Sequence, residues 1–300
     1  GTSKSARCTL ILTEGDSAKA TSIAGISAIQ NGRNIFGVFP LRGKLLNVRD
    51  ASINQITKNE EITNLKKIMG FKTGVNYTLE SLNKLRYGSI LLMMDADVDG
   101  SHIKGLLINF LHHFFPTLLS IPNFLKVLVT PIIKAKNKDN EISFSNVEEY
   151  YKWKEKNDIK KWKIKYYKGL GTSTSKEAGE YFLNYDKNIL KIEDKFKKPL
   201  HPQLYLAFSK SDADKRKMWL AKYDESNVIK FTPNLTISIT DFINKELIHF
   251  SNYDNIRSIP KLGDGLKPSS RKVLYSCFKA CNLIFLSFEH DENKIIAIII

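Results

Sequence analysis

Short apolar runs alternate with helix-type patterns along the first 115 residues, and this alternation restricts the fold more than any other feature. Residues 8–13, 34–39 and 89–94 are apolar and bounded by polar or turn-forming residues, as is typical of buried strands. Pro40 is expected to stop the second strand, and Pro116 to end the last helix. Helices are predicted over residues 17–29, 60–69, 79–86 and 100–115. The alternation predicts an α/β fold with a parallel sheet covered by helices on both faces.

Two of the predicted strands end in carboxylates. Glu14 follows the first strand, and Asp95 follows the third. In parallel α/β sheets, functional groups collect outside the carboxyl ends of the strands. If these two strands are neighbours, Glu14 and Asp95 face the same crevice.

The third strand continues into an acidic string in which aspartates occupy alternate positions. Asp95, Asp97 and Asp99 lie within five residues of one another. Like charges at this spacing repel each other unless a cation lies between them, and Mg²⁺, a hard ion with oxygen ligands, is the usual one. The string therefore predicts a magnesium site.

The acidic string lies in a strongly basic chain. Lys and Arg total 46 against 31 Asp and Glu, a formal net charge of +15. Such an excess favours a polyanionic partner, above all nucleic acid. The alternative is a solvated lysine-rich surface, which the codon bias of an AT-rich genome would also produce. An acidic metal site in a basic protein suggests magnesium-assisted chemistry on a phosphate backbone.

A calcium-binding loop is the main alternative for the string, because D-x-D-x-D-G opens such loops. A calcium loop needs a carboxylate at its twelfth position. Counted from Asp95 this position is Leu106, and the element before the string is a strand and not a helix. His102 follows the string, but magnesium prefers oxygen ligands, so a helix-start role fits it better.

Composition excludes several classes of protein. Cys8, Cys277 and Cys281 have neither a zinc spacing nor the number of a disulfide framework, which favours an intracellular protein. No apolar stretch reaches the about 20 residues of a membrane span, and residues 1–7 lack the core of a signal peptide. The chain does not begin with Met, so it is expected to be a piece of a longer protein.

The pattern changes after residue 123. The capping-box pattern of Thr174 and Glu177 predicts a helix start. Residues 186–202 are basic and mostly polar, and no regular element is predicted there. Strands are expected within 124–133 and over 162–167, and helices over 146–157, 212–223, 239–250 and 269–279. Domains are therefore expected at 1–123, 124–238 and 239–300.

The strand-end motifs resemble those of the TOPRIM module. The segments are Glu14-Gly-Asp-Ser-Ala18 after one strand and Asp95-Ala-Asp-Val-Asp-Gly-Ser-His102 after another. By itself the first motif is weak, since an ordinary strand-to-helix turn with a capping residue looks the same. TOPRIM modules occur in topoisomerases, bacterial-type primases and some nucleases.

Four further segments narrow the resemblance to the type IIA topoisomerases, and to the eukaryotic DNA topoisomerase II branch. They are PLRGKLLNVR at 40–49, YYKGLGTS at 166–173, ELIHFSN at 246–252, and the segment from Arg257 to Lys272 that contains DGLKP. The resemblance implies a TOPRIM metal-binding domain over 1–123 and a C-terminal extension over 124–238. It implies the start of a winged-helix breakage-reunion domain, truncated, over 239–300.

The resemblance also implies roles for individual residues. Glu14, Asp95 and Asp97 correspond to Mg²⁺ ligands that act in DNA cleavage, and Asp99 to a supporting ligand. Two metal ions stabilise the attacking and leaving oxygens of such a transfer, and Glu14 is expected to act as acid or base. The residues expected to contact the DNA backbone are Arg42, Lys44, Lys168, Lys267, Arg271 and Lys272.

For the whole protein, the resemblance implies an ATP-dependent enzyme that cuts, passes and reseals double-stranded DNA. It implies a homodimer in the nucleus with no membrane attachment. The family's ATPase domain precedes the matched region, and its nucleophilic tyrosine lies beyond residue 279, where the sequence departs from the family pattern. Tyr275 is too early to be that tyrosine, so the chain alone is expected to be inactive.

Two alternatives stay open. A stand-alone TOPRIM nuclease or primase would explain the acidic string but not the YKGLGTS and DGLKP segments. A non-catalytic, basic DNA-binding fragment would have an acidic cluster with only a structural role.

Overall fold

The computed structural model describes residues 4–138, 140–167, 169–194 and 201–286. The chain divides into two compact units, Gly1–Ile248 and His249–Ile300. The fold that positions the acidic string lies in the first unit.

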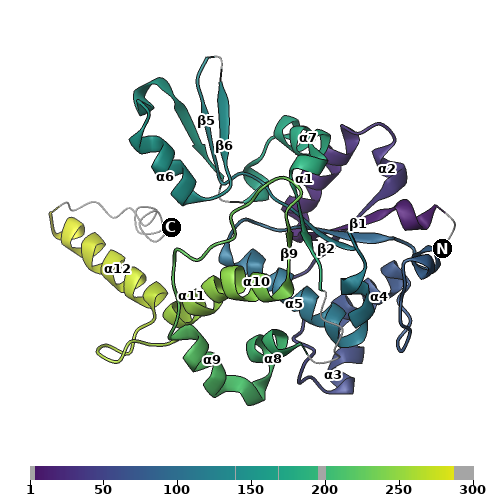
Figure 1. The fold of residues 1–300 in the computed structure, drawn as a ribbon. Coiled ribbons are helices and arrows are strands. Elements are labelled where there is room, and N and C mark those ends of the chain that lie inside the picture. The colour runs from purple at the N-terminus through teal and green to yellow at the C-terminus, as the bar shows by residue number, and fades with distance from the viewer. Residues whose placement is uncertain (1–3, 139, 168, 195–200, 287–300) are drawn as a thin grey trace. The chain divides into compact units, whose positions relative to one another are not determined.

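A six-stranded sheet forms the centre of the first unit (Figure 1). The strand order is β2-β1-β3-β4-β8-β9. Every pair is parallel except β4 with β8, which is antiparallel. The strands are β1 Thr9–Glu14, β2 Phe36–Leu41, β3 Ser89–Met93, β4 Leu125–Leu128, β8 Ile189–Ile192 and β9 Thr236–Ile237. The predicted α/β class is confirmed, with a sheet that is mostly and not wholly parallel.

Helices cover both faces of this sheet, as predicted. Side chains alternate between the faces of a strand. Ile11 and Leu91 point to the side where the helices α1 and α7 pack. Leu12 and Leu92 point to the opposite side and are equally buried, with no exposed surface. Strands buried on both faces need continuous apolar runs, which is why β1 and β3 are easy to recognise in the sequence.

The helices predicted over 17–29, 60–69 and 100–115 are present with small shifts, whereas the short helices at 32–35 and 53–58 were not predicted. Their bounds are α1 Gly15–Ser27, α2 Gly32–Ile35, α3 Ile53–Lys58, α4 Glu60–Met69 and α5 Val98–Phe114, with the 3₁₀ helices η1 Ser5–Arg7, η2 Glu80–Lys84 and η3 Pro116–Ser120. The helix predicted over 79–86 is only the short 3₁₀ helix η2. The strand β2 runs through Pro40 to Leu41 instead of stopping there. Proline is tolerated because β2 is the edge strand of the sheet.

The apolar segment 124–133 supplies two strands to two different sheets. After β4, the chain enters β5 Ile133–Lys136, which pairs antiparallel with β6 Glu141–Phe144 and β7 Lys163–Tyr166. The helix α6 Val147–Glu155 lies beside these strands (Figure 1). Tyr150 and Trp153 of α6 pack with Phe144 and Ile133 into a small core of their own.

The polar region 186–202, for which no regular element was predicted, contains a strand and the start of a helix. It contains β8, whose Ile189, Leu190 and Ile192 are buried, because the strand pairs with β4 inside the main sheet. Helix α8 Pro202–Phe208 was also missed. The remaining elements up to residue 220 are η4 Ile159–Lys161, η5 Leu170–Thr172, α7 Ser175–Leu183, η6 Tyr185–Lys187, η7 Lys210–Asp212 and α9 Ala213–Leu220.

The helix predicted over 239–250 contains an irregular turn. Helix α10 Ile239–Phe242 continues as a π-helix, η8 Ile243–Leu247, and then as α11 Ile248–Ser258. Helix α12 Pro268–Leu286 contains the predicted basic helix. Over the residues that the structure describes, no helix combines the length and apolarity needed to cross a bilayer.

The main sheet takes strands from both sides of the expected boundary at residue 123, since β4, β8 and β9 follow it. The three-domain division stays a prediction.

Phe182 provides a test of how α7 is held against α1. Its side chain is 1% exposed within the cluster that contains Ile11 and Leu91. A Cβ added at Gly25 of α1 would lie 2.2 Å from the Phe182 ring, so the two helices are in close contact. Phe182→Ala is expected to lower the free energy of unfolding by about 3–5 kcal/mol, measured by urea denaturation.

The matched control is the adjacent residue, Leu183, which is 68% exposed. Leu183→Ala is expected to change stability by about 0.5 kcal/mol or less. An equal loss for both variants would contradict the packing described for α7.

Candidate functional site

The strands that carry Glu14 and Asp95 are neighbours. β1 and β3 pair in parallel, with Thr13 opposite Met93. Glu14 ends β1, and Asp95 follows β3 by two residues. Their carboxylates therefore arise at the same edge of the sheet, as expected if the two strands were adjacent.

The three aspartates of the string have different partners. Asp97 is the N-cap of α5, and its Oδ1 accepts a hydrogen bond from the Gly100 amide at 2.8 Å. Asp99 forms an ion pair with Lys44 at 2.7 Å. Asp95 Oδ1 accepts a hydrogen bond from the backbone amide of Leu170 at 2.8 Å. The string therefore turns directly into a helix whose first turn is acidic, a favourable position relative to the helix dipole.

Glu14 is the least satisfied member of the group. Its Oε2 is buried and has no hydrogen-bond partner among the described residues. Burial raises the pKa of Glu14 above its ordinary value, and the charges of Asp95 and Asp97 raise it further, followed by that of Asp99. A hydrogen bond from the Asp95 backbone acts in the opposite direction. The ionised form of Glu14 is therefore unfavourable in this position unless a cation is near.

The donor set fits a hard divalent cation. Carboxylate oxygens are the ligands that Mg²⁺ prefers, and a cation would give the orphaned Glu14 Oε2 a partner. The side chains are not already gathered as a ligand cage, since no three His, Cys, Asp or Glu residues of the described ranges form a group ready to hold a metal. Asp97 and Asp99 are instead directed to the Gly100 amide and to Lys44.

Residues 169–173, which we call the 169–173 loop, contribute to the site in a way that sequence reasoning missed. A Cβ added at Gly169 would lie 2.4 Å from Asp95 Oδ2, so the backbone there lies directly on the carboxylate. The Leu170 amide binds Asp95, and the Leu170 carbonyl accepts a hydrogen bond from Thr21 Oγ1 at 3.1 Å. The Gly-Leu-Gly pattern indicates a turn, but nothing in it indicates what the turn packs against.

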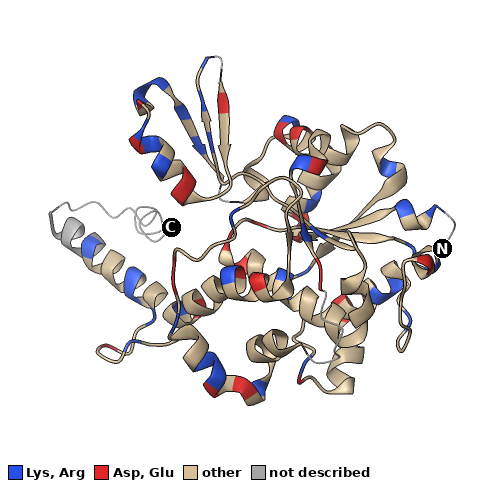
Figure 2. Cartoon of the chain, viewed as in Figure 1, with Lys and Arg blue, Asp and Glu red and all other residues tan. Residues whose placement is uncertain are grey.

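The predicted DNA contacts fall in different parts of the chain. Arg42 is exposed on the segment after β2, where Lys44 pairs with Asp99. Lys168 lies outside the described residues. In the second unit, Lys267 and Lys272 are exposed, whereas Arg271 forms a bidentate ion pair with Asp264 at 2.7 Å. Figure 2 shows blue segments on many elements, so the positive charge is distributed along the chain.

A partly buried polar network anchors the segment that carries Arg42 and Lys44. The Arg49 guanidinium donates to Asn109 Oδ1 of α5 at 2.7 and 3.1 Å and lies 4.4 Å from the centre of the Tyr205 ring. Asn47 accepts from Asn109 Nδ2 at 2.9 Å and donates to the Phe208 carbonyl at 2.8 Å. The segment is thereby tied to α5 and α8. Sequence reasoning missed this network because its members are far apart along the chain.

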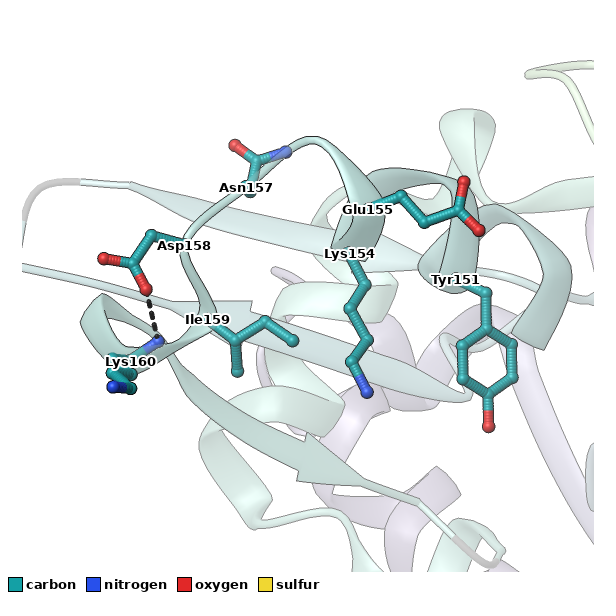
Figure 3. A pocket seen from close by; sticks show the side chains of 7 residues that line it. All are labelled: Tyr151, Lys154, Glu155, Asn157, Asp158, Ile159 and Lys160. Atoms are coloured by element: carbon teal, nitrogen blue, oxygen red, sulfur yellow. Dashed lines mark hydrogen bonds between the residues drawn. The ribbon is translucent and has the colours of Figure 1, made fainter.

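A groove of about 540 Å³ lies at the end of α6 and contains none of the predicted site residues (Figure 3). Its lining includes Lys154 and Lys160 as well as Glu155 and Asp158. The Asp158 carboxylate accepts a hydrogen bond from the Lys160 amide at 3.2 Å. Equal numbers of cations and carboxylates give this groove no preference for a charged ligand.

Comparison with known proteins defines the class to which this fold and site belong. Residues 9–130 match the model of the Toprim domain, and residues 128–255 match the model of the C-terminal associated domain of TOPRIM. The first match contains both β1 with Glu14 and the acidic string. The class is thus that of Toprim proteins, as the strand-end motifs predicted.

Proteins with similar sequences identify the family to which the chain belongs. The chain is 51% identical over 293 residues to DNA topoisomerase 2-alpha of Rattus norvegicus and 52% identical over 284 residues to DNA topoisomerase 2 of Saccharomyces cerevisiae. Both alignments include 93% of this chain and 19% of the relative. The chain belongs to the DNA topoisomerase II family, and it spans about a fifth of the length of these relatives.

A solved structure agrees with this assignment. The DNA-binding, cleavage and re-ligation domain of Plasmodium falciparum topoisomerase II matches with a TM-score of 0.83 and 47% sequence identity. The match includes 93% of this chain and 37% of that one. The predicted resemblance and fold class are confirmed.

The network around Arg49 predicts a pH dependence of stability. His112 is 3% exposed, and burial lowers its pKa to about 4, with the charges of Arg49, His201 and His113 adding to the effect. The folded pKa is below the unfolded value of 6.5, so neutral His112 stabilises the fold above pH 6.5. This contribution is lost as the pH falls from 6.5 toward 4, and amounts to about 3 kcal/mol.

His112→Asn tests this expectation. Urea denaturation at several pH values from 7.5 to 4.5 should show a smaller loss of stability with acid for the variant than for the wild type. Carboxylates that titrate in this range contribute equally to both proteins. Parallel pH profiles would contradict the assignment of the titration to His112.

Proposed function

We propose that this chain is the magnesium-binding segment of a DNA topoisomerase II that cleaves and reseals double-stranded DNA. The observation that carries the proposal is the position of Glu14 and Asp95 at one edge of the sheet. One buried Glu14 oxygen has no hydrogen-bond partner within the ranges that the structure describes. The names of the relatives support it, as does the match to a Plasmodium falciparum domain that binds, cleaves and re-ligates DNA.

Glu14, Asp95 and Asp97 would hold the metal ion, and Asp99 would support it. The chemistry that Mg²⁺ supplies at such a site is stabilisation of the charge on the attacking and leaving oxygens of a phosphoryl transfer. Glu14 would in addition act as acid or base toward the leaving hydroxyl, since its raised pKa favours exchange of a proton. Gly100 and Leu170 keep the neighbouring aspartates oriented through their amides.

The basic residues of the proposal act on the DNA backbone. Arg42 and Lys44 follow the same edge of the sheet, and Lys44 already contacts the acidic string through Asp99. A phosphate that approaches the metal site would therefore meet cations from this segment. Lys168, Lys267, Arg271 and Lys272 belong to the same proposal on the strength of the resemblance.

Properties of the whole protein rest on the family alone. Use of ATP, a homodimeric assembly and nuclear localisation are proposals of this kind. We assign the nucleophilic tyrosine to no residue of this chain.

Replacement of the proposed ligands tests the metal site. Glu14→Gln and Asp97→Asn are each expected to weaken Mn²⁺ binding by the chain roughly tenfold or more, as followed by electron paramagnetic resonance. Without metal, Glu14→Gln is expected to raise the melting temperature or leave it unchanged, because it removes a buried charge that its neighbours repel. In a full-length topoisomerase II that carries this chain, both variants should lose metal-dependent cleavage of supercoiled DNA.

The control is Glu60→Gln, at the first position of α4, which should leave Mn²⁺ binding unchanged. If both site variants retain metal-dependent cleavage, the ligand assignment is wrong. A wild-type chain that binds DNA but no Mn²⁺ at millimolar concentrations would support the non-catalytic DNA-binding alternative.

The proposed backbone contact by Arg42 is tested through the salt dependence of DNA binding. Arg42→Ala is expected to weaken binding to duplex DNA of any sequence and to reduce the slope of log K against log salt by about one. Fluorescence anisotropy at several salt concentrations measures both quantities. Lys67→Ala, which removes an exposed cation from α4, should change the slope much less, and equal slopes for the two variants would count against Arg42.

A further inference from the structure

We propose that Glu177 is the positioning residue that holds the 169–173 loop on Asp95 and thereby sets the orientation of the metal site. The inference rests on the proposed function only for the role of Asp95. The other part of the inference is that Glu177 acts as a clamp, by which we mean that its carboxylate binds residues on both sides of the 169–173 loop. These contacts are independent of any metal.

The Glu177 carboxylate is bonded from both ends of this loop. On the N-terminal side, the hydroxyl of Tyr167 donates to Oε1, and Lys165 Nζ lies 2.9 Å from both carboxylate oxygens. On the C-terminal side, the amide and hydroxyl of Thr174 donate to Oε2 at 2.7 and 3.0 Å. One side chain thus joins the two flanks of the loop.

This bonding exceeds what a helix cap requires. Thr174 and Glu177 form a capping box at the start of α7, which the sequence predicted. A capping box needs only those two residues. The additional donors, Tyr167 and Lys165, come from the end of β7, and Tyr167 is 8% exposed. The carboxylate therefore closes a loop in addition to capping a helix.

The electrostatics keep Glu177 ionised and the Tyr167 hydroxyl protonated. Burial would raise the pKa of Glu177, but the hydrogen bonds from Tyr167, Thr174 and Lys165 outweigh it and hold the pKa at about 2. Burial and the hydrogen bond to Glu177 raise the pKa of the Tyr167 hydroxyl. Charge-assisted bonds of this kind are stronger than neutral ones.

The loop that Glu177 closes is the one that contacts Asp95. Its Leu170 amide binds Asp95 Oδ1, and its Gly169 lies against the same carboxylate. Thr21 of α1 holds the Leu170 carbonyl from the other side. A change in the flanks of the loop would therefore move the donor that orients Asp95.

Hydrogen–deuterium exchange with mass spectrometry tests the clamp on the chain itself. In Glu177→Gln, amides of the 169–173 loop are expected to exchange roughly tenfold or more faster than in the wild type. The matched control is Glu180→Gln, one turn along α7, whose carboxylate lies 3.5 Å from Lys134. The control should leave loop exchange within about twofold of the wild type.

Mn²⁺ binding, followed by electron paramagnetic resonance, tests the consequence for Asp95. Glu177→Gln should weaken binding severalfold, and Glu180→Gln should leave it unchanged. Gly169→Ala should weaken binding as well, because its Cβ would displace Asp95. Gly171→Ala is its control, since an added Cβ there meets only the Ser17 side chain, at 3.5 Å.

The outcomes separate the clamp from the proposed function. Equal loop exchange in Glu177→Gln and Glu180→Gln overturns the positioning role, as does faster exchange with unchanged Mn²⁺ affinity. A wild-type chain that binds no Mn²⁺ contradicts the metal site, and the exchange comparison still decides whether Glu177 holds the loop. If Glu177→Gln does not fold, Tyr167→Phe removes one of the clamping bonds, and the same two measurements apply to it.

Discussion

The repulsion among carboxylates at one edge of the sheet is the constraint on which the site depends. Glu14 is partly buried beside three aspartates, and its pKa is raised by burial and by their charges. Such an arrangement is stable only if backbone amides and cations offset the charge. The amides of Gly100 and Leu170 and the ammonium group of Lys44 do so here.

These compensating groups come from segments far apart in the sequence. Lys44 follows β2, Gly100 begins α5, and Leu170 belongs to a loop between β7 and α7. Each segment is fixed by polar contacts of its own, Arg49 with Asn109 for the first and Glu177 with Tyr167 for the last. The acidic site therefore requires the extension after residue 123 as well as the Toprim domain.

The sequence predicted those parts of the fold that have a local cause. Apolar runs predicted β1 and β3, and the capping-box pattern predicted the start of α7. The strand β8 was missed because its flanks are polar and its partner β4 is about 60 residues away. The carboxylates of the site were predicted from their positions at strand ends, whereas the roles of Gly169 and Arg49 depend on tertiary contacts that no local pattern shows.

The carboxylate with the raised pKa, Glu14, is located at the end of a buried strand. Residues Ile11, Leu12, Leu91 and Leu92 of β1 and β3 have no exposed surface, and close packing of this kind resists displacement. A carboxylate on a flexible loop would move away from its neighbours and relieve the repulsion. Because Glu14 ends a buried, hydrogen-bonded strand, its backbone is held beside the aspartates, and a bound cation of the kind proposed above would offset the charge.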